Sequence, residues 1–418
     1  MRASLPLVAL VPLSTFLVIG VAPPPSGTAD GDVNFQRDIR PILSEQCFQC
    51  HGPDESTRQA GLRLDTRSGA FAQVRGGRAI VPGDLEASLI YQRITHHDEM
   101  LRMPPLYSKK KLTDEQLQLL KRWIEAGASW DIHWSFQPLA RPHLPTVGNE
   151  EWVRNSVDRF VLARLEAAGL EPAGEADRGA LARRVALDLT GLPPEPEVVE
   201  TYVTDVTEDA YEKLVEALLT SPHWGEHRAR YWLDAARYGD THGLHIDNYR
   251  EMWPYRDWVI QSFNDNQPFY EFTVEQIAGD LLSNPTLEQK VATGFHRCNV
   301  TTNEAGLIVD EYAAVYAKDR ADTTGTVWLG LTVACATCHD HKFDPITQRD
   351  FYAMTAFFRN TTQQVMDGNV ADTDPIVVVP HSNDRIRWEE LKHKSAHLDE
   401  QRARVESLAD ERFQTWLA

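Results

Sequence analysis

The chain lacks an excess of positive charge. Lys and Arg total 42 against 61 Asp and Glu, which gives a formal net charge of −19 over 418 residues. Such a chain would repel backbone phosphates, so we expect no nucleic acid partner, whereas a partner protein with a basic docking face would be attracted. Hydrophobic residues at 42% and charged residues at 25% are ordinary for a folded globular protein of two or three domains.

Long apolar runs are also scarce. The stretch Leu5–Val21 is just long enough to cross a membrane, and no second run of that length follows. Arg2 before it and the small residues up to Ala29 after it are typical of a secretory signal peptide. We therefore predict an exported protein of the periplasm or cell envelope with a signal peptide over residues 1–29. The alternative is an uncleaved anchor, which would be the protein's one attachment to a membrane.

Cysteine is rare, and the spacing of the five cysteines is more informative than their number. Four of them form two Cys-x-x-Cys-His motifs, and Cys298 stands alone. In such a motif two thiols add to the vinyl groups of haem c, and the following His becomes the fifth ligand of the iron. The motif residues are Cys47, Cys50 and His51, then Cys335, Cys338 and His339.

The surroundings of the first motif favour haem. Residues 35–43 have apolar positions at helical spacing, and a helix capped by Thr113 and Gln116 follows some sixty residues after the motif. Between them lies Met103, in a Pro-bounded segment that the following Pro104 keeps out of helical geometry. We predict Met103 as the sixth ligand. Its rivals are Met100, His96 and His97.

Alternating strand patterns are missing from the rest of the chain, apart from a short stretch at 376–379. Helical periodicity dominates from residue 157 to 238 and again from 384 to 416. The predicted fold class is mainly α, with a small cytochrome c-like helical haem domain followed by a larger, mostly helical domain. The predicted boundaries are 32–133 for the haem domain, 134–150 for a linker, 151–365 for the helical domain and 366–418 for a truncated C-terminal region.

Three chemistries fit the second motif. It can hold a second haem c with His339 as the fifth ligand, a zinc ion on Cys335 and Cys338 with His339 or His341, or a disulfide. The spacing does not choose a sixth ligand for a second haem. The candidates are His227, His242, His245, His296 and Met354.

Other polar residues suggest an enzyme as the alternative function. Acid–base or metal chemistry on a polysaccharide-like extracellular substrate would use carboxylates and histidines of this kind. Aromatic residues at 253, 255 and 258 suggest a binding groove, although core packing explains them more simply. The clustered residues are His242, His245, Asp247, Glu304, Asp310 and Glu311.

With these motifs described, the chain resembles the planctomycete-type cytochrome family. The segment 35–130 is similar to its N-terminal haem domain through the Cys47–His51 motif, Gly61–Asp65 and Met103-Pro104-Pro105. Residues 152–362 are similar to the following DUF1549 domain through Trp232–Tyr238, Gly294–Arg297 and Cys335–Pro345. The resemblance implies haem binding and electron transfer to a redox partner. It leaves the activity of the second domain unassigned.

Overall fold

The protein is described here from a computed structural model that covers residues 33–244, 247–366, 368, 370 and 373–417. The expected signal peptide, over residues 1–29, lies outside the described residues. Within them the only sheet is one antiparallel pair of two-residue strands. The predicted mainly α fold class is therefore confirmed. None of the described helices is both long enough and apolar enough to cross a membrane.

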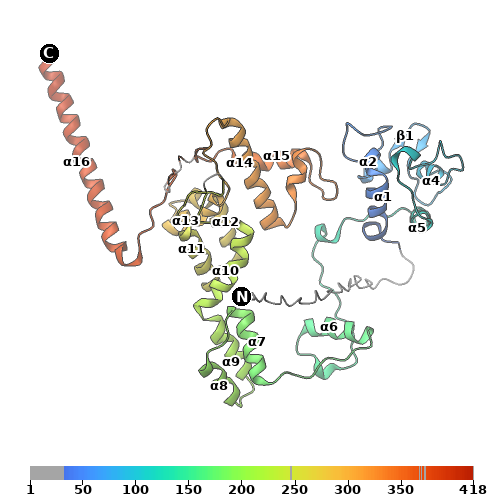
Figure 1. Cartoon of the computed structure of the whole chain (residues 1–418), viewed down its shortest axis with the longest axis horizontal. Coiled ribbons are helices and arrows are strands. Elements are labelled where there is room, and N and C mark those ends of the chain that lie inside the picture. Colours follow the sequence, from blue (N-terminus) through green and yellow to red (C-terminus); the bar gives the residue numbers. More distant parts are fainter. Residues whose placement is uncertain (1–32, 245–246, 367, 369, 371–372, 418) are drawn as a thin grey trace, which may run out of the picture. The chain divides into compact units, whose positions relative to one another are not determined.

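The chain divides into two compact units between Leu139 and Ala140, inside the expected linker. The elements of the first unit surround one core, in which Phe35, Leu43 and Trp123 are almost completely buried. Its elements are η1 (Phe35–Ile39), α1 (Arg40–Gln46), α2 (Phe48–His51), α3 (Arg67–Ala70), β1 (Gln73–Val74), β2 (Gly77–Arg78), α4 (Leu89–Ile94), η2 (Leu106–Ser108), α5 (Asp114–Glu125) and η3 (Trp134–Phe136) (Figure 1).

The final helix of this unit forms as its sequence predicts. Thr113 Oγ1 accepts the N–H of Gln116, and the Gln116 side chain accepts the N–H of Thr113, which closes a capping box at the start of α5. Trp123 and Ile124 of this helix then pack into the core. The first predicted helix begins with a π-helical turn, η1, before it continues as α1.

The second unit holds three hydrophobic clusters on its helices. Helix α10 packs against α11, and α14 packs against α15 (Figure 1). Its elements are η4 (Glu150–Trp152), α6 (Ser156–Ala167), α7 (Arg178–Thr190), α8 (Pro196–Thr204), α9 (Ala210–Leu219), α10 (Pro222–Ala236), α11 (Trp253–Asn264), α12 (Phe269–Ala278), η5 (Gly279–Leu281), α13 (Leu287–Ala292), η6 (Thr293–Arg297), α14 (Val309–Thr324), η7 (Gly325–Leu329), η8 (Val333–Thr337), α15 (Gln348–Phe358), η9 (Ser382–Asp384) and α16 (Arg385–Leu417).

One predicted element is wrong. The apolar stretch 376–379 forms no strand, and Ile376 and Val378 are about half exposed, at 52% and 50%. A strand needs a neighbour to accept its backbone hydrogen bonds, and no described strand pairs with this segment. The polar helix expected after it is present as α16.

Candidate haem sites

The first Cys-x-x-Cys-His motif lies on a tight helical turn. Cys47 joins α1 to α2, and its carbonyl accepts the N–H groups of Cys50 (3.1 Å) and His51 (2.9 Å). The loop that follows fixes the other side of the turn, because the N–H groups of Gln59 and Leu64 donate to the carbonyls of Cys50 and His51. The backbone thus holds the two thiols and the imidazole together on one short segment.

The side chains of this motif lie partly inside the first unit. Cys47 packs against the core, and burial raises the pKa of its thiol to about 12, while the charge of Lys110 acts in the opposite direction. Burial also lowers the pKa of His51, so its imidazole is neutral at pH 7. Nδ1 of His51 is buried without a hydrogen-bond partner among the described residues. A neutral ring beside two thiols fits the attachment of haem c.

The predicted sixth ligand lies on an irregular loop. The N–H of Met103 donates to the carbonyl of Arg93 (2.9 Å), and the Met103 side chain is 37% exposed. Lys110, at the far end of this loop, donates to the carbonyl of Glu45 in α1, so the loop returns to the haem motif. Several apolar side chains near Met103 in the sequence are exposed. They are Met100, Leu101, Leu106 and Tyr107. Ligation by Met103 stays a prediction.

The second motif is folded and exposed. Cys335 lies in η8, and both it and Cys338 are exposed free thiols with no disulfide between them. The Asp322 carboxylate accepts the N–H of Ala334 (3.1 Å), next to the first thiol. Inside the motif, the carbonyl of Thr337 accepts hydrogen bonds from the side chains of Gln348 and Tyr352 on α15. Helix α15 therefore holds this motif in place.

The imidazole of His339 is set up as a metal ligand. Its Nδ1 lies 2.7 Å from the carbonyl oxygen of Asp340. A carbonyl only accepts hydrogen bonds, so Nδ1 carries the proton and the lone pair is on Nε2. Iron-ligating imidazoles commonly donate their second ring N–H in this way. The His339 side chain is exposed beside two free thiols, so the residues present fit a covalent haem.

His341 has the opposite tautomer. Its Nδ1 accepts the N–H groups of Phe343 (3.2 Å) and Asp344 (2.8 Å), so its proton is on Nε2. This ring has no free lone pair, and it organises the loop before α15. Among the residues with described positions, no group of three or more His, Cys, Asp or Glu side chains could hold a metal ion. The zinc site expected at Cys335–His341 as an alternative does not form.

Exposed apolar side chains also flank the second motif. Leu329 at the end of η7 is 60% exposed, Phe343 is 46% exposed, and Tyr352 of α15 is 46% exposed while its hydroxyl reaches the motif. The second motif thus has exposed apolar residues near it in the sequence, and one of them, Tyr352, bonds to it.

One of the five candidates for a sixth ligand packs near the second motif. Met354 of α15 packs against the cluster that contains Ala336, one of the two residues between the cysteines. The ring of His296 lies 5.4 Å from Phe358 of the same cluster. His227 instead contacts Tyr231 on α10, and His245 lies outside the described residues.

The polar cluster behind the enzyme hypothesis assembles only in part. His242 is 3% exposed, and Asp247 accepts the N–H of Gly243 in the same loop (2.9 Å). Hydrogen bonds lower the pKa of Asp247, and the charge of His242 lowers it further. Asp310 and Glu311 occupy the first turn of α14, where carboxylates stabilise the helix dipole. The presence of these two carboxylates is therefore explained by the stability of the helix.

Buried arginines were not anticipated from the sequence. Arg250 is 7% exposed and donates to the carbonyls of Arg297 and Asn299, and Arg320 is 4% exposed and donates to the carbonyl of His296. These bonds fix the segment after η6. Arginine is so commonly a surface residue that no sequence signal distinguished these two from the rest.

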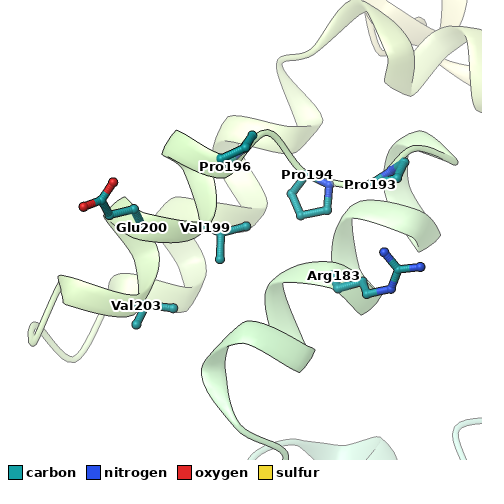
Figure 2. Close-up of a pocket in the computed structure, with 7 residues that line it drawn as sticks. All are labelled: Arg183, Pro193, Pro194, Pro196, Val199, Glu200 and Val203. Atoms are coloured by element: carbon teal, nitrogen blue, oxygen red, sulfur yellow. The ribbon is translucent and has the colours of Figure 1, made fainter.

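The aromatic residues proposed to line a groove are mainly core residues. Tyr255 is 2% exposed, and Trp258 lies in a stacked arrangement on Phe272 with 5.3 Å between ring centroids. A surface groove is found elsewhere, between α7 and α8 (Figure 2). It has a volume of 520 Å³ and contains no cysteine or histidine. Its lining residues are Arg183, Pro193, Pro194, Pro196, Val199, Glu200 and Val203.

Comparison with known proteins confirms the expected order of the two domains. Residues 47–106 match the family model for planctomycete cytochrome C, and residues 156–363 match the model for a protein of unknown function, DUF1549. The chain is also 27% identical over 125 residues to hydrazine synthase subunit alpha of Kuenenia stuttgartiensis, a match that covers 24% of this chain and 16% of that protein. No solved structure matches the chain.

Proposed function

Because the chain belongs to the planctomycete-type cytochromes, with a DUF1549 domain after the cytochrome c domain, we propose that it is an exported electron-transfer protein with two covalent haem groups. Cys47 and Cys50 would attach the first haem, with His51 and Met103 as its axial ligands. Cys335 and Cys338 would attach the second, with His339 as its fifth ligand. Bound in these places, haem supplies reversible one-electron oxidation and reduction.

The observation that carries the second haem is the tautomer of His339. The ring donates its Nδ1 proton to a backbone carbonyl and leaves its Nε2 lone pair beside two exposed thiols. Among the described residues, the two thiols are free and no group of three or more metal ligands is assembled around them. Gln348 and Tyr352 support the motif through the Thr337 carbonyl, so we propose them as positioning residues.

The test is the ratio of haem to protein, measured by the pyridine haemochrome spectrum after expression with a haem-attachment system. We expect two haems in the wild type, and one in Cys335→Ala/Cys338→Ala. The variant Cys298→Ala is the matched control, because Cys298 is a cysteine outside both motifs, and it should keep two. One haem in both the wild type and the double variant would refute the second site. No covalent haem at all would refute the whole proposal.

Location and partner follow from the same proposal. Cytochrome c domains work outside the cytoplasm, in agreement with the N-terminal segment expected to direct export. A net charge of −19 favours a redox partner with a basic docking face, held in part by long-range attraction. Association with such a partner would weaken as ionic strength rises, which stopped-flow kinetics at two salt concentrations can measure.

A further inference from the structure

From the surroundings of the two motifs we infer that the second site holds its haem iron at a lower reduction potential than the first. This inference rests on the proposed function, since it requires both sites to carry haem. At equilibrium the first site is then reduced before the second. The haem of the cytochrome c domain would then be the stronger electron acceptor of the two.

Exposure is the first argument. The side chains of Cys335, Cys338 and His339 are all exposed, whereas Cys47 and His51 are partly buried and Cys47 packs against a hydrophobic core. The oxidised iron carries one more positive charge than the reduced iron, and water stabilises that charge. A more exposed site therefore favours the oxidised state and has a lower potential.

Local charge acts in the same direction. At the first motif, the ammonium of Lys110 acts on Cys47. The Arg58 guanidinium donates to the carbonyls of Gly52 and Pro53, directly after His51, but it also lies 3.6 Å from the Glu55 carboxylate, which offsets its charge, so Lys110 is the cation on which the comparison depends. At the second motif, the Asp322 carboxylate bonds to the residue before Cys335. Asp340 and Asp344 follow the motif, against one cation, Lys342, which lies over the Phe343 ring. Positive charge raises a reduction potential, and negative charge lowers it.

The hydrogen bonds of the two ligating imidazoles complete the argument. Nδ1 of His339 donates to a carbonyl at 2.7 Å, which makes the ring a more basic ligand and stabilises the oxidised iron. Nδ1 of His51 has no such bond among the described residues, although a backbone hydrogen bond with Gln59 acts on its ring. Ligation by Met103 would widen the difference if a His, and not Met354, is the sixth ligand of the second haem, because a thioether raises the potential of a His-ligated haem.

The test is a redox titration of the purified holoprotein, followed by the haem absorbance. We expect two components of equal amplitude, and the loss of the lower one in Cys335→Ala/Cys338→Ala. Loss of the higher component would overturn the inference. A wild type with one haem would be seen first in the haem-to-protein ratio, so failure of the proposed function is distinguishable from failure of the inference.

Two single variants test the electrostatic cause. Asp322→Asn keeps an oxygen that accepts the N–H of Ala334 but removes the charge, so only the lower component should shift to higher potential. Lys110→Gln should shift only the higher component, to lower potential. Lys109→Gln is the matched control on the same loop and should change neither. If both charge variants left the potentials unchanged, the electrostatic part of the inference would be wrong.

Discussion

At the scale of single residues, hydrogen bonding decides which imidazole is available for chemistry. His339 and His341 are two residues apart, and both have Nδ1 engaged with backbone groups. One partner is a carbonyl and the others are N–H groups, so the two rings carry their protons on different nitrogens. A third imidazole, His296, donates from Nε2 to the carbonyl of Ile277 and leaves Nδ1 buried without a partner among the described residues.

His296 should make the stability of the second unit depend on pH. Burial lowers its pKa from 6.5 to about 4, so between these values the unfolded chain binds a proton that the folded state does not. The free energy of unfolding should be highest above pH 6.5 and fall as the pH drops towards 4, by about 3 kcal/mol in total. Urea unfolding of the holoprotein at pH 7 and pH 5, followed by circular dichroism, measures this loss.

The variant His296→Gln keeps an N–H donor for Ile277 but does not titrate, so it should lose less stability between the two pH values. His143→Gln is the control, because His143 is exposed in the irregular segment before η4. An equal loss in the wild type and in His296→Gln would show that another group causes the pH dependence.

At the scale of elements, close packing of α10 on α11 depends on one glycine. A Cβ atom at Gly225 would lie 2.4 Å from the carbonyl oxygen of Ile260, and the N–H of Gly225 donates to Asn264 on α11 (2.8 Å). Gly225→Ala should therefore destabilise the second unit by roughly 1–3 kcal/mol, through a forced shift of one helix. Thermal unfolding measures the change. Gly239→Ala is the matched control, since nothing lies within 4 Å of its Cβ position.

The elements also show what sequence patterns can predict. The capping box of α5 was predictable because both of its hydrogen bonds are local, between residues three apart. The failed strand at 376–379 was not, because a strand depends on a distant neighbour. The motifs are also local, so they predicted which residues would attach haem. The tautomers of His339 and His341 could not be predicted, because they depend on how their loop folds.

At the scale of the whole molecule, each unit has a hydrophobic core of its own. One cluster contains only residues of the first unit, and three contain only residues of the second. The connecting segment is exposed, with Trp134 at 78% and Leu139 fully accessible, and it is rich in proline. These features are typical of a boundary between domains that fold independently.

Limited digestion of the holoprotein with chymotrypsin should therefore cut first near Trp134, Phe136 or Leu139, because an exposed segment with only the short turn η3 enters a protease more readily than a packed helix. We expect two protected fragments, identified by mass spectrometry, each with covalent haem on a denaturing gel.

In Cys335→Ala/Cys338→Ala the larger fragment should lose its haem while the smaller one keeps it. Digestion to small peptides with no stable fragment would contradict two independent cores. If only the smaller fragment of the wild type carried haem, two independent cores would still be supported, but the proposed second haem would be refuted.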